Sequence, residues 1–150
     1  MRVPLFLTER QVDFETIVHP PAFSAQKRAK YMRIPGRQVA KCVLLAGPKG
    51  YLLAVLPSTS HVDTEAVAAF LSGPVRVARK DEVASVFPDC EWGAVPPFGT
   101  LYGLPTLLDE SLDPDTMLVF EGHTHVEAIR LSCRDFERLE RPTRLALACR

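Results

Sequence analysis

Two apolar segments separated by a short turn constrain the fold more than any other feature of the sequence. They cover residues 39–46 and 51–56, and Gly47-Pro48-Lys49-Gly50 joins them. Apolar runs of this length are typical of strands, and a turn of this composition between two of them predicts a β-hairpin. The chain is therefore expected to contain an antiparallel strand pair at this place.

Helices and strands alternate on both sides of the hairpin. The spacing predicts a helix over residues 3–10, a strand over 13–19 that stops at Pro20-Pro21, and a helix capped by Ser24 that ends at Pro35-Gly36. Downstream, Asp63 caps an expected helix with Val67, Phe70 and Leu71 toward the core and Gly73-Pro74 at its end. Further strands are expected at 75–78, 106–108, 117–121 and 126–131, with helices at 81–87 and 134–141.

This arrangement predicts an α+β fold in a single domain over residues 1–150. Hairpin-linked strands interrupted by helices favour a mixed, mainly antiparallel curved sheet or open barrel with flanking helices over a regular βαβ winding. The chain length of 150 residues, with 47% hydrophobic and 24% charged residues, suits one globular core.

Charge and cysteine content narrow the classes of partner and compartment. Lysine plus arginine and aspartate plus glutamate both total 18, so no general attraction to a polyanion is expected, DNA is not an expected partner, and any RNA contact has to be local. The four cysteines form no CxxC pair, and the first residues show no secretory signal. No apolar run approaches the ~20 residues that span a bilayer. We therefore expect a reduced, cytoplasmic protein without a membrane segment.

Lys41 is the most informative single residue because it interrupts an apolar strand. Alternation places Lys41 on one strand face with Val39, Val43 and Leu45. An ammonium group on an otherwise apolar face needs an anionic partner, and a substrate phosphate or a developing oxyanion would serve. The alternative is an edge-strand lysine that reaches out to water and prevents aggregation.

The segment from Trp92 to Gly99 is expected to be a shaped loop, because its two prolines remove donors and its glycines allow unusual backbone angles. We call residues 93–99 the glycine loop. It is suited to presenting backbone N–H groups to a carbonyl oxygen or a phosphate. A purely structural turn would explain the same residues.

No cofactor or metal is expected from the motifs. His123 and His125 are spaced for two metal ligands if the strand continues through them, but no third ligand is evident, so a hydrolase with a metal at these histidines is the weakest alternative. The sequence has no GxSxG elbow and no GxGxxG or P-loop motif. Cys42 should face away from Lys41 as a small core residue, and His19 either closes a strand or lines a pocket.

Taken together, these features resemble the YbaK/EbsC family in order and spacing over about residues 12–140. The features are His19-Pro20 before the Ser24 helix, Lys41 in its strand, residues 53–57, the glycine loop, Leu108-Asp109 and the hairpin at Gly122. This family includes the insertion domain of bacterial prolyl-tRNA synthetases and free-standing relatives that remove wrongly attached amino acids from tRNA.

The resemblance implies an aminoacyl-tRNA deacylase that needs no metal or organic cofactor and acts on a tRNA acceptor end carrying a small amino acid. Lys41 would be the catalytic residue. The implied substrate-binding residues are His19, Phe23, Gly93, Ala94, Val95, Pro96, Phe98, Gly122 and His123. Alanine-specific relatives commonly have asparagine after the lysine and cysteinyl-tRNA deacylases threonine, whereas this chain has Cys42. The amino acid therefore stays open, as does the alternative of a non-catalytic binding module acting with a synthetase.

Overall fold

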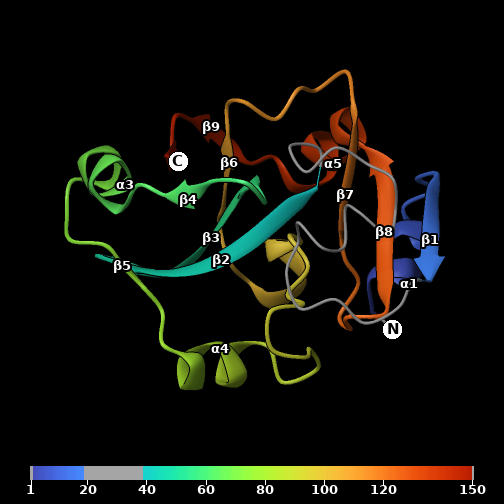
Figure 1. Ribbon diagram of the computed structural model, residues 1–150, viewed down its shortest axis with the longest axis horizontal. Coiled ribbons are helices and arrows are strands. Elements are labelled where there is room, and N and C mark those ends of the chain that lie inside the picture. The colour runs from blue at the N-terminus through green and yellow to red at the C-terminus, as the bar shows by residue number, and fades with distance from the viewer. Residues whose placement is uncertain (1, 19–38, 150) are drawn as a thin grey trace.

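A computed structural model describes residues 2–18 and 39–149 and gives the elements shown in Figure 1. Its helices are α1 (Arg2–Glu9), α3 (Thr64–Leu71), α4 (Lys80–Val86), α5 (Cys133–Glu140) and the 3-10 helix η2 (Gly99–Tyr102). Its strands are β1 (Phe14–Val18), β2 (Ala40–Gly47), β3 (Gly50–Pro57), β4 (His61–Val62), β5 (Arg76–Val77), β6 (Thr106–Asp109), β7 (Met117–Glu121), β8 (Glu127–Ser132), β9 (Thr143–Leu145) and β10 (Ala148–Cys149). In these ranges no helix has both the length and the hydropathy needed to cross a bilayer. The helix expected after Ser24 lies outside them.

The predicted hairpin is confirmed and forms the centre of the larger sheet. Strands β2 and β3 pair antiparallel without interruption from Ala40 opposite Pro57 to Gly47 opposite Gly50. Gly50 has φ +120°, a backbone conformation that residues with a Cβ rarely adopt, which suits it to close the turn. The sheet order is β5-β2-β3-β6-β9, and β3–β6 and β6–β9 are parallel pairs.

A second sheet, β1-β8-β7, is entirely antiparallel, and β4 and β10 form a separate two-stranded ladder. Figure 1 shows β2 beginning close to β7, where Val39 and Val119 form an isolated parallel bridge. The α+β class and the mixed, mainly antiparallel pairing are therefore confirmed. The strands of the described residues are divided over three sheets, and because only this bridge joins β2 to β7, they form no closed barrel.

The core between the three-stranded sheet β1-β8-β7 and helices α1 and α5 is built around Phe98. Its ring packs edge-to-face on Phe6, Phe120 and Phe136, with centroids 5.7, 5.2 and 5.5 Å away. Phe98 and Phe136 are completely buried. Since aromatic rings in this arrangement bury large apolar areas, Phe98 anchors the C-terminal end of the glycine loop in the core.

Helix α3 begins at the predicted cap, but it buries fewer apolar side chains than predicted. Asp63 caps it by accepting a hydrogen bond from the N–H of Ala66 at 3.1 Å. Val67 is buried and Leu71 packs beside it on the larger sheet. Phe70 was expected to face the core, but 50% of its surface is exposed. The prediction was wrong because the helix buries only the narrow stripe through Val67 and Leu71, and Phe70 lies beside that stripe.

Candidate functional site

Two loops that are distant in the sequence meet where β7 turns into β8. One is the segment leading into the glycine loop, and the other is the turn of residues 122–125, which we call the late hairpin. The N–H of Glu91 donates to the carbonyl oxygen of His123 at 2.9 Å. The imidazole Nε2 of His125 donates to the carbonyl oxygen of Trp92. The glycine loop and the late hairpin, which the sequence suggested separately, therefore form one structural unit.

The two loops approach so closely that a side chain at position 93 would be strained and would crowd the late hairpin. Gly93 has φ +81°, and a Cβ added there would lie 3.3 Å from Cε1 of His125. The buried His125 ring is oriented from its other side, where Nδ1 lies 3.6 Å from Oε1 of the buried Glu121. The Glu121 carboxylate and the Trp92 carbonyl thus fix the ring against which Gly93 packs.

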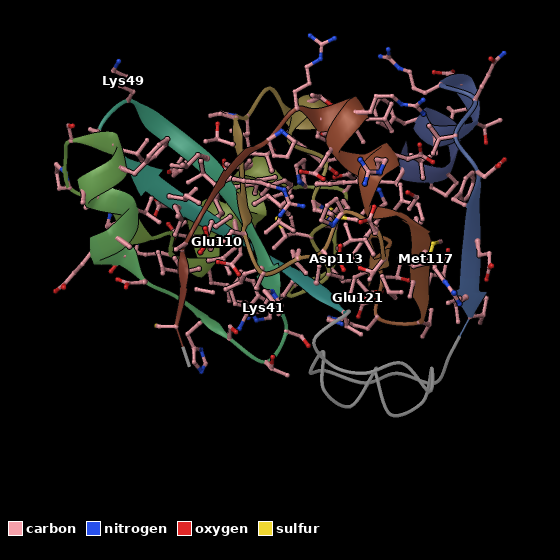
Figure 2. The ribbon with its side chains drawn as sticks, turned by 90° about the horizontal axis from the view of Figure 1, so that it is seen from above. Lys41, Lys49, Glu110, Asp113, Met117 and Glu121 are labelled. Carbon is pink, nitrogen blue, oxygen red and sulfur yellow. The ribbon has the colours of Figure 1, made fainter. Side chains whose placement is uncertain are left out.

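Lys41 lies near the start of β2, opposite Leu56 on β3, and is half-buried. Burial lowers the pKa of its ammonium group below the ordinary value, because the charged form loses hydration. The Val39–Val119 bridge brings this end of β2 to β7. Figure 2 shows Lys41 on the same side of the molecule as Glu121, whereas Lys49 projects from the distant hairpin turn. The lysine is therefore held at the junction of the two sheets.

An apolar cavity of about 180 Å³ separates the middle of β2 from the glycine loop. From β2 it is lined by Val43, which shares a strand face with Lys41, and by Cys42 and Leu44 of the opposite face, which pack in one apolar cluster with Val95. The other lining residues are Val77, Ala78, Val83, Trp92 and Gly93. Sites for drug-sized ligands measure about 300–1,000 Å³, so this cavity suits a smaller apolar group. Two larger cavities, of about 340 and 550 Å³, lie away from the glycine loop.

A polar cluster that sequence reasoning missed lies beside the late hairpin. Sγ of Cys90 is 3.1 Å from Nδ1 of His123 and 3.5 Å from the hydroxyl of Tyr102. The carboxylate of Asp89 accepts from the Tyr102 hydroxyl at 3.0 Å and lies 3.7 Å from Nδ1 of His123. The sequence does show Asp89 and Cys90, two types of metal ligand, side by side. It does not show that the fold places them next to His123.

His123 and His125 have different partners, because the strand does not continue through them, which was the condition for a shared strand face. Strand β7 ends at Glu121, and residues 122–126 form a turn in which His123 adopts φ +78°. The ring of His123 contacts Cys90, whereas that of His125 contacts Trp92 and Glu121. The two imidazoles are thus not arranged as a pair of ligands for one metal.

The remaining predicted site residues fall into three groups. Ala94, Pro96 and Phe98 are buried, and Phe98 lies in the aromatic core and not on the wall of the 180 Å³ cavity. Gly122 is buried, and its N–H closes the hairpin on the carbonyl oxygen of Glu127 at 3.0 Å. His19 and Phe23 lie outside the described residues. Cys42 packs among apolar neighbours as expected, and burial raises the pKa of its thiol.

Comparison with known proteins gives a family and a fold. The model of the aminoacyl-tRNA editing domain family matches residues 19–139. The hypothetical protein APE2540 superposes with a TM-score of 0.91 at 16% identity, covering 99% of this chain and 100% of the other. A scaffold protein used for computational epitope grafting gives 0.84 at 25% identity, covering 99% and 96%. A candidate trans-editing enzyme for prolyl-tRNA synthetase gives 0.82 at 23% identity, covering 91% and 87%. No curated protein matches the sequence significantly.

Proposed function

Because the chain belongs to the family of aminoacyl-tRNA editing domains, we propose that it is an aminoacyl-tRNA deacylase that acts in trans. It would hydrolyse the ester between a small misattached amino acid and the terminal ribose of tRNA. The observation that carries this proposal is the union of the glycine loop and the late hairpin beside a small apolar cavity, with Lys41 on the adjoining strand.

The glycine loop supplies the donors for the ester carbonyl. As this oxygen becomes an oxyanion, rigid N–H groups aimed at it stabilise the transition state more than the bound substrate. The N–H of Ala94 already donates to Glu91 at 3.0 Å, and that of Gly122 to Glu127. We therefore assign the oxyanion contact to the N–H groups of Gly93 and Val95.

Lys41 provides the positive charge. It would hold the terminal phosphate or stabilise charge that develops at the reacting ribose oxygen. Its half-buried position supports this role, because an ammonium group acts more strongly on a substrate charge when less water screens it. An anionic substrate would in turn compensate for the hydration that this ammonium loses by burial.

The nucleophile is water, a ribose hydroxyl or a side chain of the substrate. Cys42 is unsuitable, because burial raises its thiol pKa and thus keeps it protonated. We assign no metal to this step, since the N–H donors and Lys41 account for the polarisation of the carbonyl. The choice between the three nucleophiles is testable by comparing substrates that lack the ribose hydroxyl or the side-chain thiol.

Selection by size follows from the cavity. Its walls, including Val43 and Val95, leave room for a small apolar side chain only. An apolar pocket discriminates a single methylene by about 1–3 kcal/mol, which explains why a second, separate editing site is useful after aminoacylation. His19 and Phe23 stay predictions as further substrate contacts.

Contact with tRNA should be confined to the acceptor end. With equal numbers of basic and acidic residues, the protein has no net charge with which to attract the whole polyanion. We therefore propose weak binding with a modest salt dependence, strengthened by a synthetase partner that delivers the tRNA. Because its substrate arises during aminoacylation, the protein would work in the cytoplasm.

A deacylation panel tests the proposal. Purified protein is incubated with tRNAs mischarged with amino acids of increasing size, and release of the amino acid is followed. The proposal predicts turnover of small aminoacyl esters and a sharp loss with larger ones. Saturable binding without release would instead identify a binding module that leaves the chemistry to a synthetase.

A further inference from the structure

Three side chains that the proposed deacylation does not require as a set form a constellation typical of a transition-metal site. Asp89, Cys90 and His123 each offer one ligand atom, and these atoms lie within 4.8 Å of one another. Carboxylate, thiol and imidazole are all ligands of Zn²⁺ in proteins. We propose that Asp89, Cys90 and His123 bind a divalent transition-metal ion, with Zn²⁺ as the preferred species.

The separations between the ligand atoms fit a tetrahedral ion. Bonds of about 2.3 Å to sulfur and 2.0–2.2 Å to nitrogen or oxygen place tetrahedral ligands about 3.3–3.6 Å apart. The structure has Cys90 Sγ 3.1 Å from His123 Nδ1, Cys90 Sγ 3.5 Å from an Asp89 oxygen, and the other Asp89 oxygen 3.7 Å from Nδ1. The one ligand oxygen that Asp89 offers lies within 4.8 Å of both other ligand atoms, so a rotation of the carboxylate that brings this oxygen toward Sγ and Nδ1 together would complete the geometry.

The backbone holds the three ligands ready for the ion. The hydrogen bond from the Glu91 N–H to the His123 carbonyl oxygen ties the segment carrying Asp89 and Cys90 to the late hairpin. His123 adopts φ +78°, a conformation that histidine, asparagine and aspartate enter more often than most residues. The three ligand side chains are therefore carried by two backbone segments that are hydrogen-bonded to each other.

The surroundings provide a route to solvent and a supporting contact. The His123 side chain is 5% exposed, Cys90 is half-buried, and 32% of the Asp89 side chain is accessible. An ion can thus enter past Asp89 and keep water as its fourth ligand. The Tyr102 hydroxyl donates to Asp89 at 3.0 Å and would orient the carboxylate from the outside.

The donor set also determines which ions should bind. A thiolate and an imidazole favour Zn²⁺, Co²⁺ or Cu²⁺, whereas Mg²⁺ and Ca²⁺ prefer sites built from oxygen alone. The site goes beyond the deacylation proposed above, and its occupancy can be measured without tRNA. If the deacylation panel shows no turnover, the metal site can therefore still be present. If no metal binds, the protein can still be a deacylase.

Metal titration of the full chain, freed of metal and kept reduced, tests the inference. Co²⁺ should give one equivalent of binding with a thiolate-to-cobalt charge-transfer band in the near ultraviolet. Zn²⁺ should displace the Co²⁺, and Mg²⁺ should not. Zn²⁺ at 100 times its dissociation constant should raise the Tm by about 5–10 °C.

Matched variants locate the site. Cys90→Ser should remove the charge-transfer band and the Tm shift, and His123→Asn, which suits the left-handed backbone, should weaken Zn²⁺ binding at least about tenfold. Cys149→Ser is the control, because exposed Cys149 lies opposite His61 on the β4–β10 ladder and offers an alternative thiol and imidazole. It should bind metal like the wild type. Circular dichroism and the metal-free Tm establish that each variant is folded.

Three results would overturn the proposal: no Co²⁺ or Zn²⁺ binding by the wild type, an unchanged charge-transfer band in folded Cys90→Ser, or loss of the band in Cys149→Ser. If Cys90→Ser does not fold, His123→Asn and Asp89→Asn decide the matter by the same two readouts. Binding unchanged in both of them would equally reject the site.

Discussion

Replacing Gly93 by alanine should damage the site more than it damages the fold. The new Cβ would lie 3.3 Å from Cε1 of His125, tighter than the 3.5–4.0 Å at which carbon atoms attract, so the ring has to move by a few tenths of an ångström. That ring donates to the carbonyl oxygen of Trp92, the residue before the glycine loop. The substitution therefore displaces the donors assigned to the ester carbonyl.

The cost in stability can be worked out from the backbone and checked against a second glycine. A left-handed backbone costs alanine about 1–2 kcal/mol, and the smaller conformational freedom of the unfolded chain returns about 0.4–1 kcal/mol. Gly93→Ala should thus lower the free energy of unfolding by about 1 kcal/mol. The close contact with His125 should add a smaller loss to this. Gly103 has φ +69° with nothing within 4 Å of an added Cβ, so Gly103→Ala carries the backbone cost alone.

Urea unfolding and deacylation kinetics of both variants separate the two effects. Both proteins should fold, with free energies of unfolding about 1 kcal/mol below the wild type. In Gly93→Ala, kcat/KM should fall about tenfold or more, because small displacements of aligned groups are costly to catalysis. In Gly103→Ala it should stay within about twofold. Wild-type kcat/KM in Gly93→Ala, or an equal loss in Gly103→Ala, would refute the placement of the site.

Three further substitutions test the packing and electrostatics by urea unfolding. Phe98→Ala should destabilise by about 3–5 kcal/mol because it empties the centre of the aromatic core, and a loss below 1 kcal/mol would contradict that packing. Hydrogen bonds from Arg76 hold the pKa of Glu82 below its usual 4.5, so its stabilisation is present above that pH and is lost on acidification. Glu82→Gln should therefore be less stable than the wild type at neutral pH, and the gap should narrow below about pH 4.5; a gap independent of pH would argue against the ion pair. Burial raises the pKa of Glu140 despite its bonds to Thr100, so the wild type should lose stability relative to Glu140→Gln as pH rises from 4.5 through the raised pKa, and the opposite trend would contradict the assignment.

Local signals in the sequence predicted most of the secondary structure. The hairpin followed from Gly47 and Gly50 flanking a turn, and the start of α3 from the capping carboxylate of Asp63, both of which depend on neighbours a few residues away. Strands β4, β9 and β10 were not predicted. They are short, and because β9 pairs with β6 and β4 with β10, only the tertiary fold makes them strands.

The candidate site was predicted in its parts but not in its assembly. Gly93 and His123 were recognised as separate features, whereas the contact of His125 with Trp92 joins positions 33 residues apart. The same is true of Cys90 and His123, which are also 33 residues apart. Sequence periodicity does not predict contacts over that distance, and the shared strand face considered for the two histidines does not arise because the chain turns at Gly122.

Deacylation by Lys41→Met, measured beside Lys49→Met, tests the central claim most directly. Both substitutions remove one positive charge, but Lys41 is half-buried on β2 and Lys49 is exposed on the hairpin turn (Figure 2). Lys41→Met should fold at least as stably as the wild type, because burial disfavours its charge, and should lose on the order of 10²-fold or more in kcat/KM. Lys49→Met should retain full activity. Wild-type kcat/KM in a folded Lys41→Met protein would contradict the account.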